Sequence, residues 1–201
     1  MELSDDQVDR LNRLYVAWAE AEKAIKIADQ TVGDVIIPAI KELRYAGRKL
    51  SKSLHNYVEG TNLTDADRWL EDAINDCFRA RHDATDAATA FIADRLEHAI
   101  TALGTEAVRE HFVEYSDLRG LLSSIRKKVA DSRHDHNGRH DIYDNIEVDE
   151  LPKIMELYEK FLANEPHMKN KRFRAWLKNQ GFTYAFLITF ILLIIRMFFW
   201  D

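Results

Sequence analysis

One polar segment in the second half of the chain gathers the side chains best suited to chemistry. Between Arg133 and Asp141 stand three histidines, two aspartates and two arginines. Imidazole groups transfer protons near neutral pH, and guanidinium groups bind phosphate. Histidine and aspartate are also ligands of metal ions. The segment therefore has three interpretations: a solvated loop, a metal site, or a site for chemistry on a phosphate ester.

The metal interpretation depends on several ligand types that lie close together in the chain. Zinc sites usually combine a rigid ligand spacing with supporting hydrogen bonds, and the two neighbouring arginines would repel a cation. We therefore predict no bound metal and no other cofactor. The ligand types concerned are His134, Asp135, His136, His140 and Asp141.

The phosphate interpretation depends on Arg133, the polar residue directly after it, and His140 seven positions further on. This pattern resembles the signature of the HEPN superfamily of helical ribonucleases and RNA-binding proteins. The resemblance implies a dimerising bundle of four or five helices, with Arg133 and His140 of both chains in one cleft. It also implies proton transfer by His140 at a ribose 2′-hydroxyl and contact of Arg133 with the scissile phosphate. A continuous helix would place both residues on one face, whereas Asn137-Gly138 is a turn signal that would interrupt it.

No other catalytic motif stands out in the sequence. It contains no phosphate-binding Gly-rich loop, no Gly-x-Gly-x-x-Gly and no His-Glu-x-x-His. The single cysteine, Cys77, lies on a stripe of small residues and is predicted to be buried. Whether the chain is an enzyme stays open, with a non-enzymatic role favoured. If it is one, the expectation is a metal-independent endoribonuclease.

A second feature is the apolar run over 182–200, FTYAFLITFILLIIRMFFW. At about 1.5 Å per residue, a helix of this length reaches roughly across the hydrocarbon core of a bilayer. The run has no polar face, which disfavours a helix of a soluble core. We therefore predict a C-terminal, single-pass transmembrane helix. The basic residues before it, which suit lipid headgroups, are Lys169, Lys171, Arg172, Arg174 and Lys178.

The charge distribution predicts the orientation of this anchor. The net charge is −6, but six basic residues and one acid from Lys169 onward contribute +5, which leaves −11 before it. Basic residues beside a membrane helix stay on the cytoplasmic side and are attracted to an anionic inner leaflet. The prediction is a cytosolic helical bundle over 1–166, a basic juxtamembrane stem over 167–181 and a transmembrane helix over 182–200. An acidic bundle is not a general nucleic-acid binder, so RNA is a partner only under the ribonuclease interpretation.

Arg196 interrupts the apolar run. Its side chain either extends to the far headgroups or faces other copies of the chain in an assembly, where pairing or hydration would offset the cost of a charge in lipid. In an assembly, Tyr184 and Thr189 would line the same contact. We predict a homo-oligomer.

The sequence of residues 1–166 predicts only helices. Apolar residues recur at steps of three and four, composition favours helix, and no run alternates with a period of two. The expected class is all-α, an elongated antiparallel bundle of four or five helices. The interruption around Gly33 and Pro38 is compatible with two structures for residues 4–58, a long kinked helix or a hairpin of two helices. The kinked helix is slightly favoured. Further helices are expected over 64–103, from Thr105 to about 129, and over 147–164.

Two polar patterns on these helices have no assigned role. A basic face at helical spacing is predicted to be solvated: Lys41, Arg44, Arg48 and Lys52. The pairs Arg79–Asp83 and His82–Asp86 are spaced as ion pairs within one helix. A more speculative hypothesis places them in a buried cluster against Arg44 and Arg48.

These features favour a membrane-anchored effector or assembly protein that oligomerises and acts at the membrane. In architecture it is similar to small helical proteins of bacterial defence systems, including membrane-pore accessory proteins of RNA-guided systems, which combine a HEPN-like domain with a membrane helix. Two alternatives remain. One is a membrane-tethered HEPN-type ribonuclease, and the other is a passive scaffold whose heptad faces recruit a helical partner.

Overall fold

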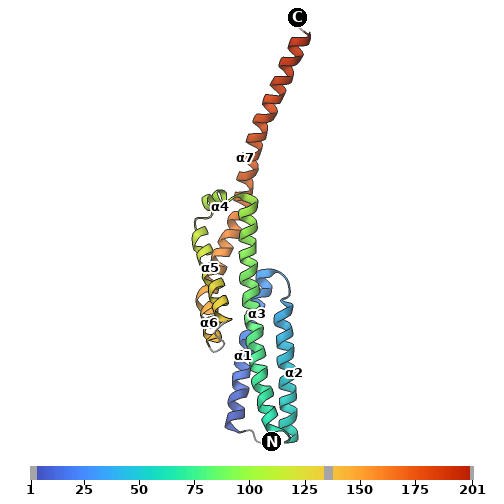
Figure 1. Ribbon diagram of the computed structural model, residues 1–201, viewed down its shortest axis with the longest axis vertical. Coiled ribbons are helices and arrows are strands. Elements are labelled where there is room, and N and C mark those ends of the chain that lie inside the picture. Colours follow the sequence, from blue (N-terminus) through green and yellow to red (C-terminus); the bar gives the residue numbers. More distant parts are fainter. Residues whose placement is uncertain (1–3, 134–137, 200–201) are drawn as a thin grey trace. The chain divides into compact units, whose positions relative to one another are not determined.

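The computed structural model describes residues 4–133 and 138–199. In the last helix, the side chains from residue 191 onward and several between 172 and 187 lie outside this description. Helices and short turns make up the described residues, and no strand occurs among them (Figure 1). The predicted all-α class and the presence of a helical bundle are therefore confirmed.

The helices follow one another with short connections. In chain order they are α1 (Asp5–Val32), α2 (Ile37–Glu59), α3 (Leu63–Leu103), α4 (Thr105–His111), α5 (Tyr115–Ser132), α6 (Arg139–Asn145), the π-helical turn η1 (Ile146–Glu150) and α7 (Leu151–Phe199). The chain forms two compact units, which are described separately below. Unit 1 joins Met1–Arg95 with Gly120–Ile154, and unit 2 joins Leu96–Arg119 with Met155–Asp201.

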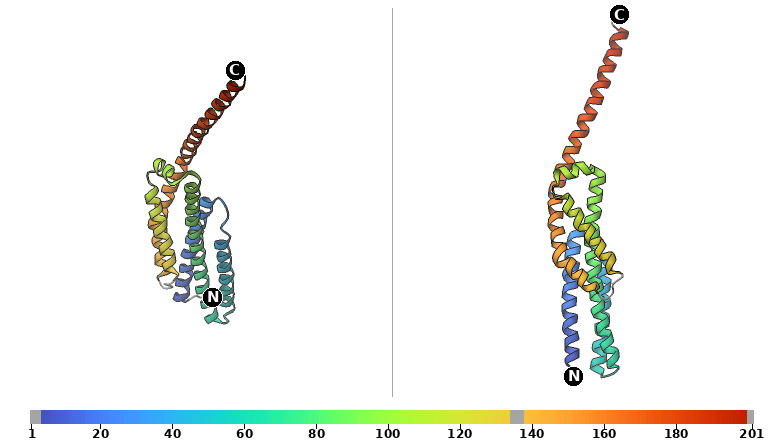
Figure 2. Two further views of the ribbon diagram at one scale, coloured as in Figure 1. Left: turned by 45° about the horizontal axis from the view of Figure 1, so that its top comes forward. Right: turned by 60° about the vertical axis from the view of Figure 1, so that its left-hand side comes forward.

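In unit 1, α1 and α2 form a hairpin, so the favoured kinked helix is wrong. Gly33 ends α1 with a left-handed φ of 76°, and its N–H donates to the carbonyl of Asp29. The Asp29 carboxylate then accepts the N–H of Ile36 at 3.0 Å, which directs the chain into α2. Pro38 lies in the first turn of α2, where its missing N–H costs nothing. Figures 1 and 2 show α2 running back beside α1.

Small side chains fill the contact between α1, α2 and α3. A Cβ added to Gly47 of α2 would lie 3.5 Å from the Trp18 indole of α1, so these helices approach closely. Cys77 is fully buried, as predicted, and burial raises the pKa of its thiol to about 12. The buried alanines of this core include Ala17, Ala21, Ala24, Ala28, Ala39, Ala46, Ala66, Ala73, Ala80 and Ala84.

The helix predicted from Thr105 to about residue 129 is divided in two. Phe112 has extended backbone angles between α4 and α5, and its side chain is fully buried. Within unit 2 its ring meets Phe161 of α7 edge to face, with ring centroids 5.6 Å apart. Burial of this ring stabilises the break, although the helical periodicity of the sequence runs through it.

The predicted helix end at residue 164, just before Pro166, is also wrong, because α7 continues through the proline to Phe199. A proline within a helix removes one backbone hydrogen bond, and packing can outweigh this loss. Met168, two residues later, is fully buried, and Lys169 pairs with Glu165 across the proline at 2.8 Å. The predicted stem over 167–181 is therefore part of one continuous helix.

Candidate functional site

Unit 1 contains a buried polar cluster centred on the middle of α3. Its position follows from the alanine-rich sequence of α3. The small side chains of α3 let α6 and η1 approach closely, and the polar side chains of α3 that stand among the alanines then meet those of α6 and η1. We call it the α3–α6 cluster. Its members are Arg81, His82, Thr85 and Asp86 of α3, His140, Tyr143 and Asp144 of α6, and Glu147 of η1.

Arg81 binds carboxylates from three different elements. Its Nε lies 2.7 Å from Glu147, and its Nη1 lies 2.6 Å from Asp144 and 3.2 Å from Glu20 of α1. The arginine side chain is only 8% exposed. Glu147 also accepts a hydrogen bond from the Thr85 hydroxyl at 2.9 Å. Burial raises the pKa of Glu147, and the contact with Arg81 opposes this effect.

Two histidines contact aromatic rings within the same cluster. His82 lies flat against the Tyr143 ring at 3.8 Å between centroids, and His140 lies 3.9 Å from the ring of Phe78. The two imidazoles are 5.5 Å apart. His82 is 4% exposed, and burial, with the charge of Arg139 as the next cause, lowers its pKa to about 3. His82 is therefore neutral at physiological pH.

Several nitrogen atoms in this region are buried without a hydrogen-bond partner among the described residues. They are Nε2 of His82, Nδ1 of His140 and Nε of Arg139. Burial also lowers the pKa of His140, although this imidazole is less enclosed than that of His82. A neutral imidazole accepts a proton, so His140 is the member of this group best suited to act as a base.

Asp86 forms the other end of the cluster. The Tyr143 hydroxyl donates to its Oδ1 at 3.0 Å. Burial raises the pKa of Asp86, whereas this hydrogen bond and the charges of Arg133 and Arg139 lower it. Burial, followed by the charge of Asp86, raises the pKa of Tyr143 to about 12. Tyr143 is therefore a permanent hydrogen-bond donor at neutral pH.

The residues of the HEPN-like pattern lie on different segments. Arg133 follows the end of α5 and is exposed, whereas His140 belongs to α6, so no single helix carries both. Both nevertheless lie near the α3–α6 cluster, Arg133 through its charge on Asp86 and His140 through its ring contacts. His134, Asp135 and His136 lie outside the described residues. Among the residues that are described, no group of metal-ligating side chains is close enough to hold an ion.

The polar pairs predicted within α3 are replaced by other contacts, one of which, Arg79–Asp76, lies within α3 itself. His82 stacks on Tyr143, and Asp86 binds the hydroxyl of that tyrosine, rather than pairing with each other. Arg79 binds Glu42 and Asp76. The hypothesis of a buried polar cluster placed these residues against Arg44 and Arg48 of α2. Among the described residues, α6 supplies the contacts of His82 and Asp86, and Glu42 of α2 supplies that of Arg79. Arg81 was missed, and its only signal was a charged residue beside an alanine stripe.

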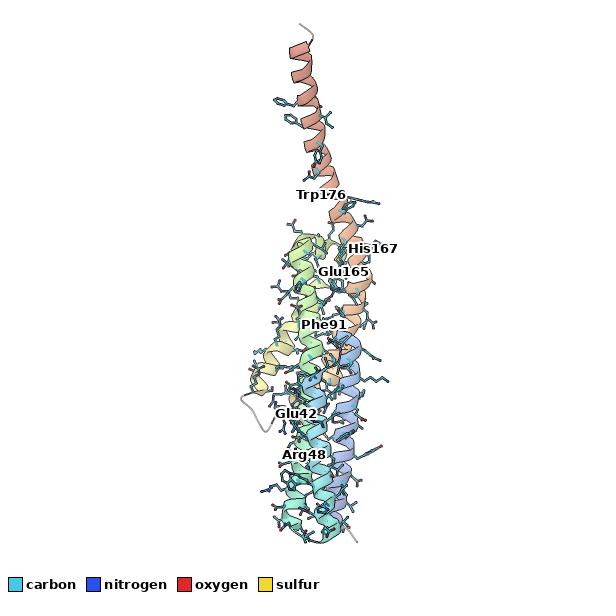
Figure 3. The ribbon with its side chains drawn as sticks, turned by 90° about the vertical axis from the view of Figure 1, so that its right-hand side faces the viewer. Glu42, Arg48, Phe91, Glu165, His167 and Trp176 are labelled. Carbon is cyan, nitrogen blue, oxygen red and sulfur yellow. The ribbon has the colours of Figure 1, made fainter. Side chains whose placement is uncertain are left out.

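The second candidate region is the later part of α7, in unit 2. Phe173 and Trp176 stack at 6.1 Å between centroids and are both more than half exposed (Trp176 is labelled in Figure 3). The following apolar side chains are also exposed: Tyr184 61%, Phe186 71%, Ile188 57% and Phe190 55%. Large apolar side chains grouped in this way mark a surface that contacts another apolar phase or molecule.

The predicted basic residues occupy the same helix. Lys169 pairs with Glu165, Lys171 contacts Glu110, and Arg174 is exposed. Thr189 is exposed like its neighbours. The side chains of Arg172, Lys178 and Arg196 lie outside the description, as does Trp200.

Within the residues whose placement is described, no helix combines the length and the apolar character that a membrane crossing requires. Most side chains of the predicted segment 182–200 lie outside that set. Comparison with protein families, with characterised proteins and with solved structures gives no match for this chain.

Proposed function

We propose that this protein is a membrane-anchored helical assembly protein. Its bundle would be held at a membrane surface by the later part of α7, where copies of the chain would associate. The observation that carries the proposal is the continuity of α7, a helix of 49 residues whose early side chains are buried and whose later ones are apolar and exposed. A membrane would cover the exposed part without any further protein partner.

The energetics support a lipid environment for this segment. Burying one large aliphatic or aromatic side chain stabilises by about 1.5–3 kcal/mol, and four such side chains between Tyr184 and Phe190 are more than half exposed. The remaining sequence to Trp200 is apolar apart from Arg196. Removal of this surface from water therefore provides ample free energy for membrane insertion.

The aromatic and basic residues before this segment suit a headgroup region. Phe173 and Trp176 are exposed at this level of α7, and aromatic side chains favour the membrane–water interface. Lys169, Lys171 and Arg174 lie beside them, and each cation near an anionic surface contributes about 1 kcal/mol. The Lys171–Glu110 contact is exposed on both sides and therefore weak, and the Lys169 side chain is itself 64% exposed, so both lysines can reorient toward lipid.

Membrane fractionation tests the anchor. Membranes from cells that produce the full chain are washed with alkaline carbonate, which removes peripheral proteins. We expect the wild-type chain and the conservative variant Ile191→Leu/Leu192→Ile in the pellet. The variant Ile191→Lys/Leu192→Lys should move to the soluble fraction, because each charge at the centre of a helix costs about 3 kcal/mol to insert. A wild-type chain that carbonate removes would refute the proposal.

A ribonuclease is a second candidate, which the surroundings of His140 favour. Burial lowers the pKa of His140, the charge of Arg139 acts on both His140 and Asp86, and the charge of Arg133 acts on Asp86. A neutral imidazole in a region that arginines make positive suits cleavage of a phosphodiester next to a ribose hydroxyl. Cleavage of a fluorescent single-stranded RNA by the full chain provides the test. Activity should disappear in Arg133→Ala and His140→Ala and persist in His55→Ala, a variant of an exposed histidine. No cleavage by the wild-type chain removes this candidate and leaves the anchor proposal unaffected.

A further inference from the structure

Unit 1 contains a groove on the α2–α3 face that neither the membrane anchor nor the α3–α6 cluster uses. Its volume is about 550 Å³, within the range of roughly 300–1,000 Å³ typical of small-molecule sites. Figure 3 labels Glu42 and Arg48 of this region along α2. We call it the α2–α3 groove. Its lining residues are Glu42, Tyr45, Arg48, Lys49, Lys52, Trp69, Asp76 and Arg79.

The groove is positively charged although the bundle as a whole is acidic. Four cations and two carboxylates line it. Both carboxylates are already engaged, because Asp76 binds Lys49 at 2.8 Å and Glu42 binds Arg79 at 2.9 Å. No ion pair is found for Arg48 or Lys52 within the described part of the chain. Two cations thus remain for an anionic ligand.

A buried carboxylate fixes part of this charge in place. Asp76 is fully buried, and besides Lys49 it also contacts Arg79. Burial of a carboxylate is unfavourable unless cations compensate it, so these contacts hold the Lys49 side chain of α2 against α3 and orient the Arg79 side chain on α3. Cations held in advance lose less conformational entropy when a ligand arrives, and this favours binding.

Aromatic side chains complete the site. Trp69 is half-buried, and the Lys52 ammonium lies 4.4 Å from its ring centroid. Tyr45 is 42% exposed. Flat rings stack on such side chains, while phosphate oxygens accept hydrogen bonds from guanidinium and ammonium groups. The combination suits a ligand that carries both a phosphate and an aromatic ring.

We propose that the α2–α3 groove binds a nucleoside phosphate, either as a free nucleotide or as part of a single strand. Arg48 and Lys52 bind the phosphate, with Lys49 and Arg79 held beside them by Asp76. The base stacks on the Tyr45 ring, or it replaces the Lys52 ammonium over the Trp69 ring. This site is independent of the membrane anchor and of any reaction at His140.

Calorimetric titration of the full chain in a zwitterionic detergent tests the proposal. The probes are adenosine triphosphate, a short single-stranded oligonucleotide and inorganic tripolyphosphate. We expect the first two to bind, with affinities that fall as salt is added because the contacts are electrostatic. Tighter binding of the mononucleotide identifies a nucleotide site, and tighter binding of the oligonucleotide identifies a strand site. Tripolyphosphate should bind at least about tenfold more weakly because it cannot stack.

Matched charge reversals separate the groove from general electrostatics. Arg48→Glu/Lys52→Glu should weaken binding by more than about tenfold, since two charge-assisted contacts are lost. Lys23→Glu/Lys26→Glu changes the net charge equally on exposed positions of α1 and should leave affinity within about twofold. The proposal is overturned if neither nucleotide probe binds, if both double variants bind alike, or if tripolyphosphate binds as tightly as the nucleotides.

Discussion

Arg81 connects three elements of unit 1 through a single side chain. Its guanidinium contacts Glu20 of α1, Asp144 of α6 and Glu147 of η1. Two of these carboxylates are about half exposed, whereas the Glu147 side chain is only 16% exposed. The free-energy effect of losing Arg81 therefore depends mainly on Glu147.

Replacing Arg81 by methionine should lower the free energy of unfolding by about 3 kcal/mol, because a buried carboxylate loses its cation. Urea unfolding followed by circular dichroism measures this. Arg68→Met removes an exposed pair with Asp65 and should cost less than about 0.5 kcal/mol. The double variant Arg81→Met/Glu147→Gln should recover part of the loss. If it is no more stable than Arg81→Met, the buried charge is not the cause.

His82 makes stability depend on pH. Its folded-state pKa is lowered from 6.5 to about 3, so between these values the unfolded chain binds a proton that the folded chain excludes. Stability is therefore complete above about pH 6.5 and falls by up to about 1.4 kcal/mol per pH unit as the solution is acidified toward the folded pKa. The charges of Arg139, His140 and Arg81 oppose protonation of His82 in the same direction.

The variant His82→Phe keeps a flat ring against Tyr143 but cannot be protonated. We expect its unfolding midpoint in urea to change less between about pH 7 and about pH 5 than that of the wild-type chain. The remaining slope should come partly from His140, whose pKa is also lowered. Equal slopes for both proteins would show that His82 is not the titrating group.

At the scale of elements, helix ends are set by a few residues and by packing. This dependence can be tested with two glycines, because Gly33 ends a helix and Gly120 lies inside one. Gly33 ends α1 in the left-handed region, with φ at 76°, whereas Gly120 lies within α5 and an added Cβ there meets nothing within 4 Å.

The same glycine-to-alanine change should act in opposite directions at these two positions. Gly33→Ala should destabilise by about 1 kcal/mol because alanine is strained in the left-handed conformation. Gly120→Ala should stabilise by about 0.5–1 kcal/mol, since alanine loses less backbone entropy in a helix. Thermal unfolding of both variants provides the comparison. A stabilising Gly33→Ala would contradict the α1–α2 turn described above.

At the scale of the whole molecule, Arg196 distinguishes a passive anchor from an assembly surface. A charge within an apolar helix costs a few kcal/mol in lipid, and a contact with another copy or with water reduces this cost. If copies associate through Arg196, Arg196→Leu should reduce the oligomer size measured by light scattering in detergent. Lys178→Leu, a change of equal charge in the stem, should leave the size unchanged. An unaltered Arg196→Leu oligomer would indicate that the arginine only reaches the headgroups.

Local sequence information was sufficient for the helical class and for several boundaries. Ser4 caps α1 at the start of the predicted helical region 4–58, and Gly104 follows the predicted end of α3. Such features depend on the preferences of single residues and on the three-to-four spacing of apolar side chains, both of which are written locally in the chain. The apolar run from residue 182 likewise follows from composition alone.

Packing between distant segments decided the remainder. Sequence periodicity runs through Phe112, yet burial of its ring against Phe161 ends α4 there. Pro166 signals a helix end, yet α7 continues past it because Met168 is buried beyond it. Helical preferences are about 1 kcal/mol or less for most residues and about 3 kcal/mol for proline, which is no larger than the burial energy of one or two large side chains, so tertiary contacts override them.

The candidate sites were likewise predictable in part from local sequence, while tertiary packing determined the rest. The sequence by itself identified which residues carry charge and which imidazoles stand near arginines. Only the tertiary structure placed His82 against Tyr143 and Arg81 among carboxylates from three elements. The predicted basic face is exposed, as expected, and the tertiary structure also places two of its residues, Arg48 and Lys52, in the lining of a groove with Trp69 and Asp76. The physical reason is that burial and charge pairing depend on which helices meet, and no local pattern along one helix contains its partner.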